Sequence, residues 1–272
     1  MTHAPALFVS HGAPTFALEP GLLGPNLTHL GARLSGLAAV AVVSAHWQTP
    51  GVQVMRTAAP ETVHDFGGFT PALYQLRYPA PGAPAIAAET AALLKSAGIE
   101  ATFDGARGID HGVWVPLLYL LPKAQVPVFQ ISLPINCSAE YALRLGRALK
   151  PLRRRGVMVM GSGSLTHNQR DIRQFDPSLS KYVVEFTAWV RTHVQRRDMQ
   201  ALVEYRRHAP HAERAHPSEE HFLPLLVALG ASEDADAVNV IEGGVTYGVL
   251  SMESYAFEIG QSEARLGPGA AV

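Results

Sequence analysis

Two apolar runs in this sequence lead directly into a histidine. In "LFVSHGAP", residues 7–14, the run reaches His11 just before a glycine, and in "AVVSAHWQTP", residues 41–50, it reaches His46. A third histidine, His167, follows the apolar run of "VMVMGSGSLTHNQ". Histidine is the commonest metal ligand and the usual acid–base side chain near neutral pH. These positions are therefore candidates for a metal site or a catalytic centre.

Three further histidines lie in segments that suit such a site. His221 lies in "HPSEEHFLPLLVALGA", where Ser218 is predicted to cap a helix over Glu219–Leu229, so that the histidine falls in the first turn. His111 ends a loop in "GIDHGVWVPLLYLLP", and His64 lies in "VHDFGGFTPALY" beside two glycines that let the backbone approach a ligand closely. For each histidine taken alone, the alternative is a loop or surface residue that is hydrogen-bonded to its neighbours.

The strands and helices that would position these histidines alternate along the chain. The runs "AVAVVSA" and "VMVMG" are apolar throughout, which is typical of strands covered on both faces of a sheet. The predicted strands are Leu7–His11, Ala39–His46, Val52–Arg56, Val126–Leu133, Val157–Gly161, Val238–Glu242 and Gly248–Phe257. The predicted helices are Gly21–Ser35, Ala83–Ala97, Val113–Leu121, Ala139–Arg154, Leu179–Arg196 and Glu219–Leu229. This order predicts an α/β fold with a mostly parallel or mixed central sheet, covered by helices on both faces.

The positions of the histidines relative to these strands argue for a shared site. In open α/β sheets, ligands bind beyond the carboxyl ends of the strands. His11, His46 and His167 all fall at predicted strand ends. Three strand ends that share one residue type are harder to explain as unrelated loop histidines than a single one would be.

The composition excludes several classes of protein. The net charge of −1 does not indicate binding to nucleic acid or to an anionic membrane. The single cysteine, Cys137, permits neither an internal disulfide nor a cysteine-rich metal knuckle. No run approaches the roughly 18 apolar residues of a transmembrane helix, and "MTHAPALFVSHGAP" lacks the regions of a signal peptide. We expect a cytoplasmic protein.

The chain is predicted to form one catalytic domain over residues 1–261, with a flexible tail of small and polar residues over 262–272. No internal repeat or Ser/Gly linker divides it. The segment "GSGS", residues 161–164, superficially resembles a nucleophile elbow. It lacks the Gly-x-Ser-x-Gly spacing followed by a helix, so a serine hydrolase is a minor alternative.

Six segments taken together resemble a known family: "VSHGAP", "SAHW", "HDFGGF", "DHGVWVPL", "GSGSLTHN" and "HPSEEHFLPLLVALGA". The chain resembles the DOPA-dioxygenase type of class III extradiol ring-cleaving dioxygenases, which are related to the catalytic subunit of protocatechuate 4,5-dioxygenase. The resemblance runs in order from about residue 5 to residue 257. Each motif alone is weak, but six in order are specific.

The resemblance implies a mononuclear non-haem metal, Fe(II) in active members, although zinc can occupy such sites. It implies that His11, His46 and His221 are the ligands; the protocatechuate branch carries a glutamate at the position of His221. His167 matches the catalytic base or an additional ligand. His111 matches a residue that contacts the substrate or oxygen.

The chemistry of ring cleavage explains this set of residues. Cleavage of a catechol by O2 is spin-forbidden without a metal, and Fe(II) with three protein ligands on one face leaves positions for two catechol oxygens and O2. A neutral histidine suits the proton transfer that we assign to His167. Three neutral ligands also suit zinc, so zinc is a possible bound metal. The predicted substrate contacts are His64, Phe66, Trp114 and Tyr247; the alternative is core packing for the aromatic residues and a loop-capping role for His64.

Two other functions are consistent with the same histidines. A zinc-dependent hydrolase would use the three ligands to activate water and would need no O2. A non-catalytic metal-binding module would need no base at His167. The predicted partners of the dioxygenase are a small catechol and O2, with no nucleic acid and no membrane, and the sequence selects neither a particular catechol nor an oligomeric state.

Overall fold

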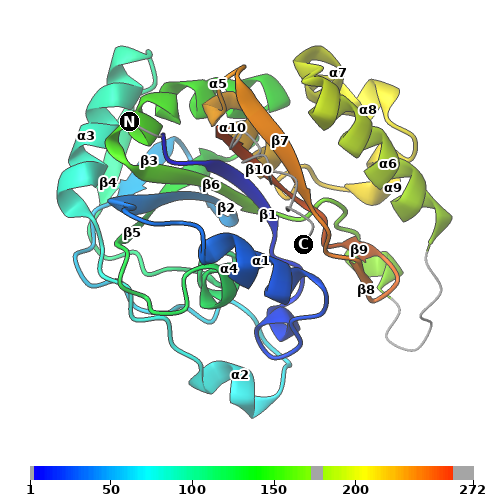
Figure 1. Ribbon diagram of the computed structural model, residues 1–272, viewed down its shortest axis with the longest axis horizontal. Helices are drawn as coiled ribbons and strands as arrows, with labels where there is room; N and C mark the ends of the chain where they lie inside the picture. Colours follow the sequence, from blue (N-terminus) through cyan, green and yellow to red (C-terminus); the bar gives the residue numbers. More distant parts are fainter. Residues whose placement is uncertain (1–2, 173–179, 260–272) are drawn as a thin grey trace, which may run out of the picture.

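A mixed β-sheet runs through the centre of the molecule (Figure 1). The computed structural model describes residues 3–172 and 180–259, and within them eight strands form the main sheet in the order β4-β3-β5-β2-β6-β1-β10-β7. These strands are β1 (Ala6–Ser10), β2 (Ala39–Thr49), β3 (Val52–Met55), β4 (Ala101–Asp104), β5 (Val128–Pro134), β6 (Val157–Gly163), β7 (Asp236–Ile241) and β10 (Ser254–Ile259). A separate short ribbon pairs β8 (Val245–Thr246) with β9 (Leu250–Ser251).

Four parallel strands form the middle of the sheet. β1 and β2 flank β6, and β5 lies on the other side of β2, all in parallel register. β10 and β3 then pair antiparallel at either side of this group. The carboxyl ends of β1, β2, β5 and β6 therefore meet at one edge of the sheet, where α/β folds bind ligands.

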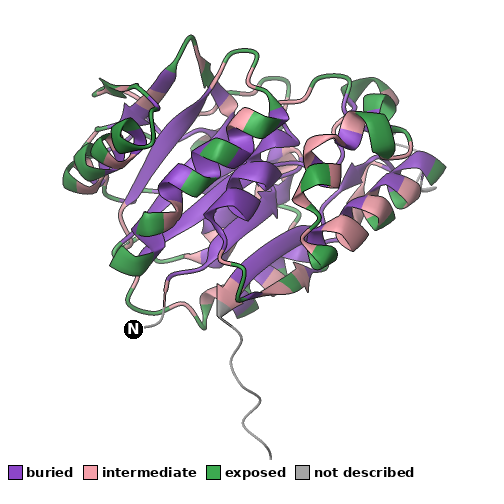
Figure 2. Cartoon of the chain, turned by 90° about the horizontal axis from the view of Figure 1, so that it is seen from above, coloured by how far each residue is buried: buried purple, intermediate pink, exposed green. Residues whose placement is uncertain are grey.

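The helices cover both faces of the sheet. They are α1 (Leu23–Gly31), α2 (Pro71–Gln75), α3 (Pro84–Ser96), α4 (His111–Leu120), α5 (Ala139–Leu149), α6 (Lys181–Arg196), α7 (Met199–Val203), α8 (Tyr205–His208), α9 (Ala212–Ala215) and α10 (Leu223–Ala231). Short 3-10 turns occupy Pro14–Ala17, Lys150–Arg155 and Gln169–Asp171. α3, α5 and α10 lie on one face, and α1 and α4 lie on the other (Figure 1). Figure 2 shows that burial is concentrated in the strands and the inner helix faces.

Local sequence explains the helices of the first face. Ser138 caps α5, since its side chain accepts a hydrogen bond from the backbone N–H of Tyr141. α10 is apolar all round and every residue from 223 to 231 is buried, as expected for a helix enclosed between α5 and the sheet. Gly146 and Gly230 allow the close approach of these two helices, because a Cβ at Gly146 would lie 2.1 Å from the carbonyl oxygen of Val227.

The predicted α/β class and its helix-covered mixed sheet are confirmed, and the differences lie at element boundaries and in short elements that were not predicted. β2 does not end at His46 but continues to Thr49, with a register shift between Val43 and Gln48. The strand predicted over Gly248–Phe257 is divided between β9 and β10. β4 was missed because its residues are largely exposed and carry no apolar run.

The start of the last helix was also predicted wrongly. α10 begins at Leu223, not at Glu219, and its N-cap position makes no side-chain capping bond. The hydroxyl of Ser218 instead donates to the carboxylate of Glu220. A turn over residues 219–222, closed by the backbone bond from Phe222 N–H to the oxygen of Glu219, precedes the helix. His221 is therefore in this turn rather than in the helix.

Two expectations fall partly outside the described residues. The predicted helix Leu179–Arg196 is seen as α6 from Lys181, while its first residue is not described. The domain boundary at residue 261 and the tail 262–272 also lie beyond residue 259. Within the described part, no helix combines the length and the apolar character needed to cross a bilayer.

Candidate metal centre

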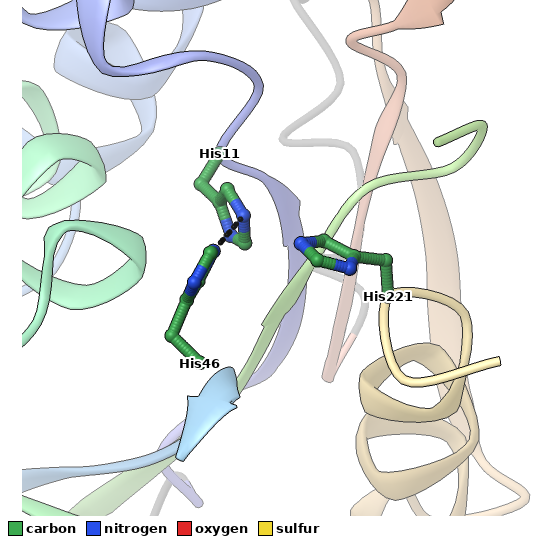
Figure 3. Close-up of side chains that lie close together, drawn as sticks. All are labelled: His11, His46 and His221. Carbon is green, nitrogen blue, oxygen red and sulfur yellow. Dashed lines mark hydrogen bonds between the residues drawn. The ribbon is translucent and has the colours of Figure 1, made fainter. Parts of the chain in front are cut away.

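His11, His46 and His221 converge at the carboxyl edge of the sheet (Figure 3). His11 directly follows β1, His46 lies in the irregular part of β2, and His221 lies in the turn before α10. The ring centroid of His11 lies 4.8 Å from that of His46 and 5.3 Å from that of His221. The ring of His46 lies 5.1 Å from that of His221. Three segments that are far apart in the sequence thus present imidazoles to one point.

Ser162 of β6 sets the tautomer of His11. Its hydroxyl donates to the carbonyl oxygen of Gly112, so its oxygen can accept from Nδ1–H of His11 at 2.9 Å. Nε2 of His11 is then left with a lone pair. That lone pair faces Nε2 of His46 at a distance of 3.0 Å.

Glu220 sets the tautomer of His221 in the same way. Its Oε1 lies 3.0 Å from Nδ1 of His221, which therefore carries the proton. The carboxylate pKa is lowered to about 2: burial raises it, but the hydrogen bonds from His221 and Ser218 outweigh burial. Nε2 of His221 is buried, and no hydrogen-bond partner lies within its reach among the described residues.

Asp65 connects His46 to His111. Its Oδ1 accepts from both the backbone N–H and Nδ1–H of His111, at 2.9 and 2.8 Å, and its Oδ2 lies 3.4 Å from Nδ1 of His46. Although burial raises the pKa of Asp65, the bonds from His111 lower it to about 2. Asp65 thus holds the first residue of α4 and directs Nε2 of both imidazoles away from itself.

Burial keeps the three converging histidines neutral. It lowers the pKa of His11 and of His221 well below the ordinary value; the hydrogen bond to Glu220 raises the pKa of His221, while the neighbouring imidazoles lower both values further. The pKa of His46 is lowered to about 4, again mainly by burial. At neutral pH each of these imidazoles therefore carries a single N–H, and the partner of Nδ1 decides whether Nε2 is free to bind a metal.

A metal ion fits this donor set. Two nitrogens that are each about 2.1 Å from one metal lie roughly 3.0–3.4 Å apart, and the two Nε2 atoms of His11 and His46 are 3.0 Å apart. The unpartnered Nε2 of His221 supplies a third neutral donor. The ligand atoms of all three residues lie within 4.8 Å of one another. Their second nitrogens are supported by a hydroxyl or a carboxylate, as is usual for metal-bound histidines.

His167 lies beside this group without belonging to it. Its ring stacks on that of His221, with centroids 3.5 Å apart and planes inclined by 9°. Burial lowers the pKa of His167, while the charge of Glu220 acts in the opposite direction. Nitrogens of His167 and His221 and a carboxylate oxygen of Glu220 lie within 4.8 Å of one another. The structure thus brings His167 next to a candidate ligand.

The "GSGS" segment serves packing rather than nucleophilic chemistry. A Cβ at Gly163 would lie 2.2 Å from the carbonyl oxygen of His221, and one at Gly161 would lie 2.0 Å from that of Pro224. Glycine at both positions therefore lets β6 pass against the turn that carries His221. Ser162 is fully buried and its hydroxyl is engaged by His11 and Gly112, which removes it as a candidate nucleophile.

The predicted aromatic contacts lie on two sides of the cluster. Phe66 meets the ring of His111 edge-on at 5.6 Å. His64 lies one step further out, 5.6 Å from Phe66, and its Nε2–H donates to the carbonyl oxygen of Leu76. Trp114 is fully buried beneath them, with its indole N–H bonded to the oxygen of Val63. The structure therefore places Phe66 nearest to the cluster and Trp114 under it.

Tyr247 lies on the other side, in the ribbon of β8 and β9. Its hydroxyl is 2.6 Å from the hydroxyl of Thr15, and its backbone has a φ of +52°. It lines a cavity of about 210 Å³ together with Ala13 and Met252. Since Met252 also contacts Gly12, this cavity is adjacent to the chain segment that follows His11.

Sequence reasoning missed the residues that orient the histidines. Asp65 and Glu220 were given no role in the site, and Ser162 was considered only as part of the segment that resembles a nucleophile elbow. The pairing of a carboxylate with a histidine was detectable for Glu220, because this residue directly precedes His221. The partners of Asp65 and Ser162 were not, since His111 is 46 residues from Asp65 and His11 is 151 residues from Ser162.

Residues 1–258 match the family model described as the catalytic LigB subunit of aromatic ring-opening dioxygenase. The chain belongs to this family. Among the similar LigB-family proteins is the 4,5-DOPA dioxygenase extradiol of Escherichia coli (strain K12), which is 38% identical over 258 residues, covering 93% of this chain and 94% of the relative. The 4,5-DOPA dioxygenase extradiol of Beta vulgaris is 34% identical over 256 residues, covering 92% and 95%.

A solved structure agrees with this assignment. The crystal structure of an uncharacterized protein from Escherichia coli K12 superimposes with a TM-score of 0.79 at 32% sequence identity, covering 93% of this chain and 99% of that chain. As a LigB-family member with these relatives, the protein is an extradiol ring-opening dioxygenase. The family is metal-dependent, and the histidine cluster is a group that could hold the metal.

Proposed function

We propose that this protein binds one metal ion between His11, His46 and His221 and uses it to cleave a catechol ring with O2. The observation that supports the proposal is the approach of Nε2 of His11 to Nε2 of His46, which at 3.0 Å matches the spacing of two nitrogens on one metal ion, beside the unpartnered Nε2 of His221. In the tautomers favoured by Ser162 next to His11 and by Asp65 next to His46, both Nε2 atoms present lone pairs, which a metal ion between them would stabilise. When bound, Fe(II) supplies the sites at which the catechol oxygens and O2 are brought together.

We assign the transfer of the catechol proton to His167. Its neutral imidazole, with a pKa lowered by burial, can accept a proton at neutral pH. Because its ring stacks on that of His221, His167 would lie within reach of a catechol hydroxyl held at the proposed metal. The same imidazole would return the proton to the opened product.

His111, whose ring lies 4.1 Å from that of His46, is proposed to act on oxygen. Because Nδ1–H of His111 donates to Asp65, its Nε2 carries a lone pair that can accept a proton. The carboxylate of Asp65 would stabilise the imidazolium that forms, which could then donate to a developing negative charge on oxygen. Asp65 and His111 thus form a proton-holding pair.

The substrate is proposed to be a small catechol, such as DOPA. The relatives from Escherichia coli and Beta vulgaris carry the name 4,5-DOPA dioxygenase extradiol. Phe66 and His64 would form one wall for the flat ring and Tyr247 would approach from the other side, while Trp114 supports the wall from beneath. This distribution suits a ligand that is apolar on its faces and polar at its edges.

Fe(II) is the metal that we expect for activity, and zinc is expected to bind as an inactive substitute. Three neutral imidazoles suit both ions, and zinc has no redox chemistry. Metal analysis of the protein purified without added iron would check this, since iron as the only metal found would contradict it. We propose a cytoplasmic location for the enzyme.

The test is oxygen uptake by the iron-loaded protein. Metal is removed, Fe(II) is added without air, and the protein is mixed with DOPA or simple catechols in aerated buffer. We expect O2 consumption with a yellow product, lost in His221→Ala together with iron binding, and lost in His167→Ala with iron still bound. Ser132→Ala, a buried serine of β5 that bonds to Thr49 and Gln53, is the matched control.

The outcome also separates the alternatives. No oxygen uptake with any catechol, while iron is shown to be bound, would contradict the proposal. Metal-dependent hydrolysis of esters or amides without O2 would then favour the hydrolase, and metal binding without any turnover would favour a binding module. Full activity of His167→Ala would refute the assignment of the base alone.

A further inference from the structure

A buried histidine outside the metal centre contacts the segment that carries His167. His216 is wholly buried, and its ring lies among Phe186, Tyr205 and Phe222 at centroid distances of 5.6, 6.2 and 5.3 Å. Its Nε2 lies 2.9 Å from the carbonyl oxygen of Leu165, two residues before His167. Since a carbonyl only accepts, Nε2 of His216 carries a proton and donates it.

Both ends of this contact are held in place. The backbone N–H of His216 donates to the oxygen of Ala212, and its own carbonyl oxygen accepts from Nη1 of Arg206. On the other side, the backbone N–H of Leu165 donates to the hydroxyl of Ser10. The bond from His216 to Leu165 therefore joins two segments that are each anchored elsewhere.

The bond from His216 joins two segments, residues 164–168 and 214–221, that are connected by further hydrogen bonds. We call this set of hydrogen bonds the brace. The backbone N–H of Ser164 donates to the oxygen of His221, and that of His167 donates to the oxygen of Ala215. The amide of Asn168 donates to the oxygen of Arg214. Of the two side-chain bonds in the brace, the one from His216 is fully buried. A buried polar group that loses its hydrogen-bond partner destabilises the fold more than an exposed one.

We propose that His216 is a positioning residue for ring cleavage, which acts by holding the 164–168 segment so that the His167 imidazole stays stacked on His221. The proposal rests on the function proposed above, in which His167 transfers the substrate proton. His216 itself touches neither of those rings among the contacts of the structure, so its influence passes through the Leu165 carbonyl. A misplacement of about 1 Å at a catalytic group can cost about 100-fold in rate.

Two substitutions of similar polarity separate the bond from the mere presence of a polar side chain. In His216→Gln the amide nitrogen can take the place of Nε2 and donate to Leu165, whereas the shorter amide of His216→Asn takes the place of Nδ1. Nδ1 has no partner among the described residues. The glutamine variant should therefore retain most of the kcat that the asparagine variant loses.

The measurement is steady-state oxygen uptake with DOPA by the iron-loaded enzyme, together with iron affinity. We expect His216→Asn to lower kcat about 10–100-fold, with KM and iron affinity within about threefold of wild type, and His216→Gln to recover most of kcat. The comparison of the two variants also separates positioning from general loss of stability, because only the asparagine variant lacks the donor to the Leu165 oxygen.

Several outcomes would overturn the proposal. Equal kcat in His216→Asn and wild type would show that the bond does not position His167. Equal losses in the asparagine and glutamine variants, or a loss of iron affinity in proportion to kcat, would show a purely structural role. If His216→Asn does not fold, unchanged kcat in Arg206→Gln, which removes the bond to the His216 carbonyl, would overturn it. Wild-type enzyme without any oxygen uptake would instead refute the proposed function.

Discussion

The hydroxyl of Ser162 is predicted to control the metal affinity of His11. In Ser162→Ala the buried Nδ1–H of His11 loses its acceptor, since His11 is 1% exposed and water cannot replace the serine. The metal-free protein can adapt by moving the proton to Nε2, where it would donate to Nε2 of His46 at 3.0 Å. The metal-bound protein cannot, because the metal needs that lone pair.

Because only the metal-bound protein keeps the unsatisfied N–H, the substitution lowers the affinity for the metal. A buried N–H without a partner costs about 1–3 kcal/mol, and loss of a group that orients a metal-bound histidine weakens metal binding about 10–100-fold. At about 1.4 kcal/mol for each factor of ten, the two ranges agree. We therefore expect the dissociation constant for zinc to rise about 10–100-fold in Ser162→Ala.

The assay is competition for zinc between the metal-free protein and a chromophoric chelator, which requires no activity. Ser132→Ala is again the control, because it removes a buried hydroxyl of β5 that bonds to Thr49 and Gln53, not to any histidine of the cluster. We expect the control to bind zinc as wild type does. Wild-type zinc affinity in Ser162→Ala would refute both the tautomer of His11 and its assignment as a ligand.

Three other predictions follow from the same geometry. Glu220→Gln keeps an acceptor for Nδ1–H of His221 but removes its charge, so zinc affinity should fall about tenfold in the chelator assay, and unchanged affinity would contradict this role. Gly163→Ala places a Cβ 2.2 Å from the carbonyl oxygen of His221, so the free energy of unfolding in urea should fall by about 1–3 kcal/mol. A urea midpoint equal to that of wild type would contradict this. The metal-free protein should lose stability as pH falls from 6.5 toward 3, because burial lowers the pKa of His46 to about 4 and that of His216 to about 3. The unfolded chain then binds protons that the folded chain does not; thermal midpoints that do not change with pH would contradict this.

The order of strands and helices was predictable because it depends on local patterns. Runs such as "AVAVVSA" are apolar throughout, and in the structure residues 39–45 are buried in the centre of the sheet. The boundaries were less predictable where a local pattern conflicts with tertiary contacts. Ser218 has the residue type of a helix cap, but its hydroxyl bonds to Glu220, and the turn that holds His221 packs against Gly163 of β6.

The convergence of three histidines was also predictable in outline. Strand ends of a parallel sheet share one edge, so His11 and His46 had to lie near each other once the fold class was known. The position of His221 depended on the resemblance to a family, because neither its turn nor its distance to the sheet can be read from a helical pattern. The structure brings all three within ligand distance of one another.

The sequence by itself determined which residue types are available and where along the chain they occur: histidines at strand ends, a carboxylate before His221, and glycines in β6. Only the tertiary structure decided what each imidazole does, because its tautomer depends on the partner of its second nitrogen. For three of the imidazoles those partners come from other segments, Ser162 for His11 and Asp65 for both His46 and His111. A lone pair is directed at a metal by such long-range contacts, which no local periodicity encodes.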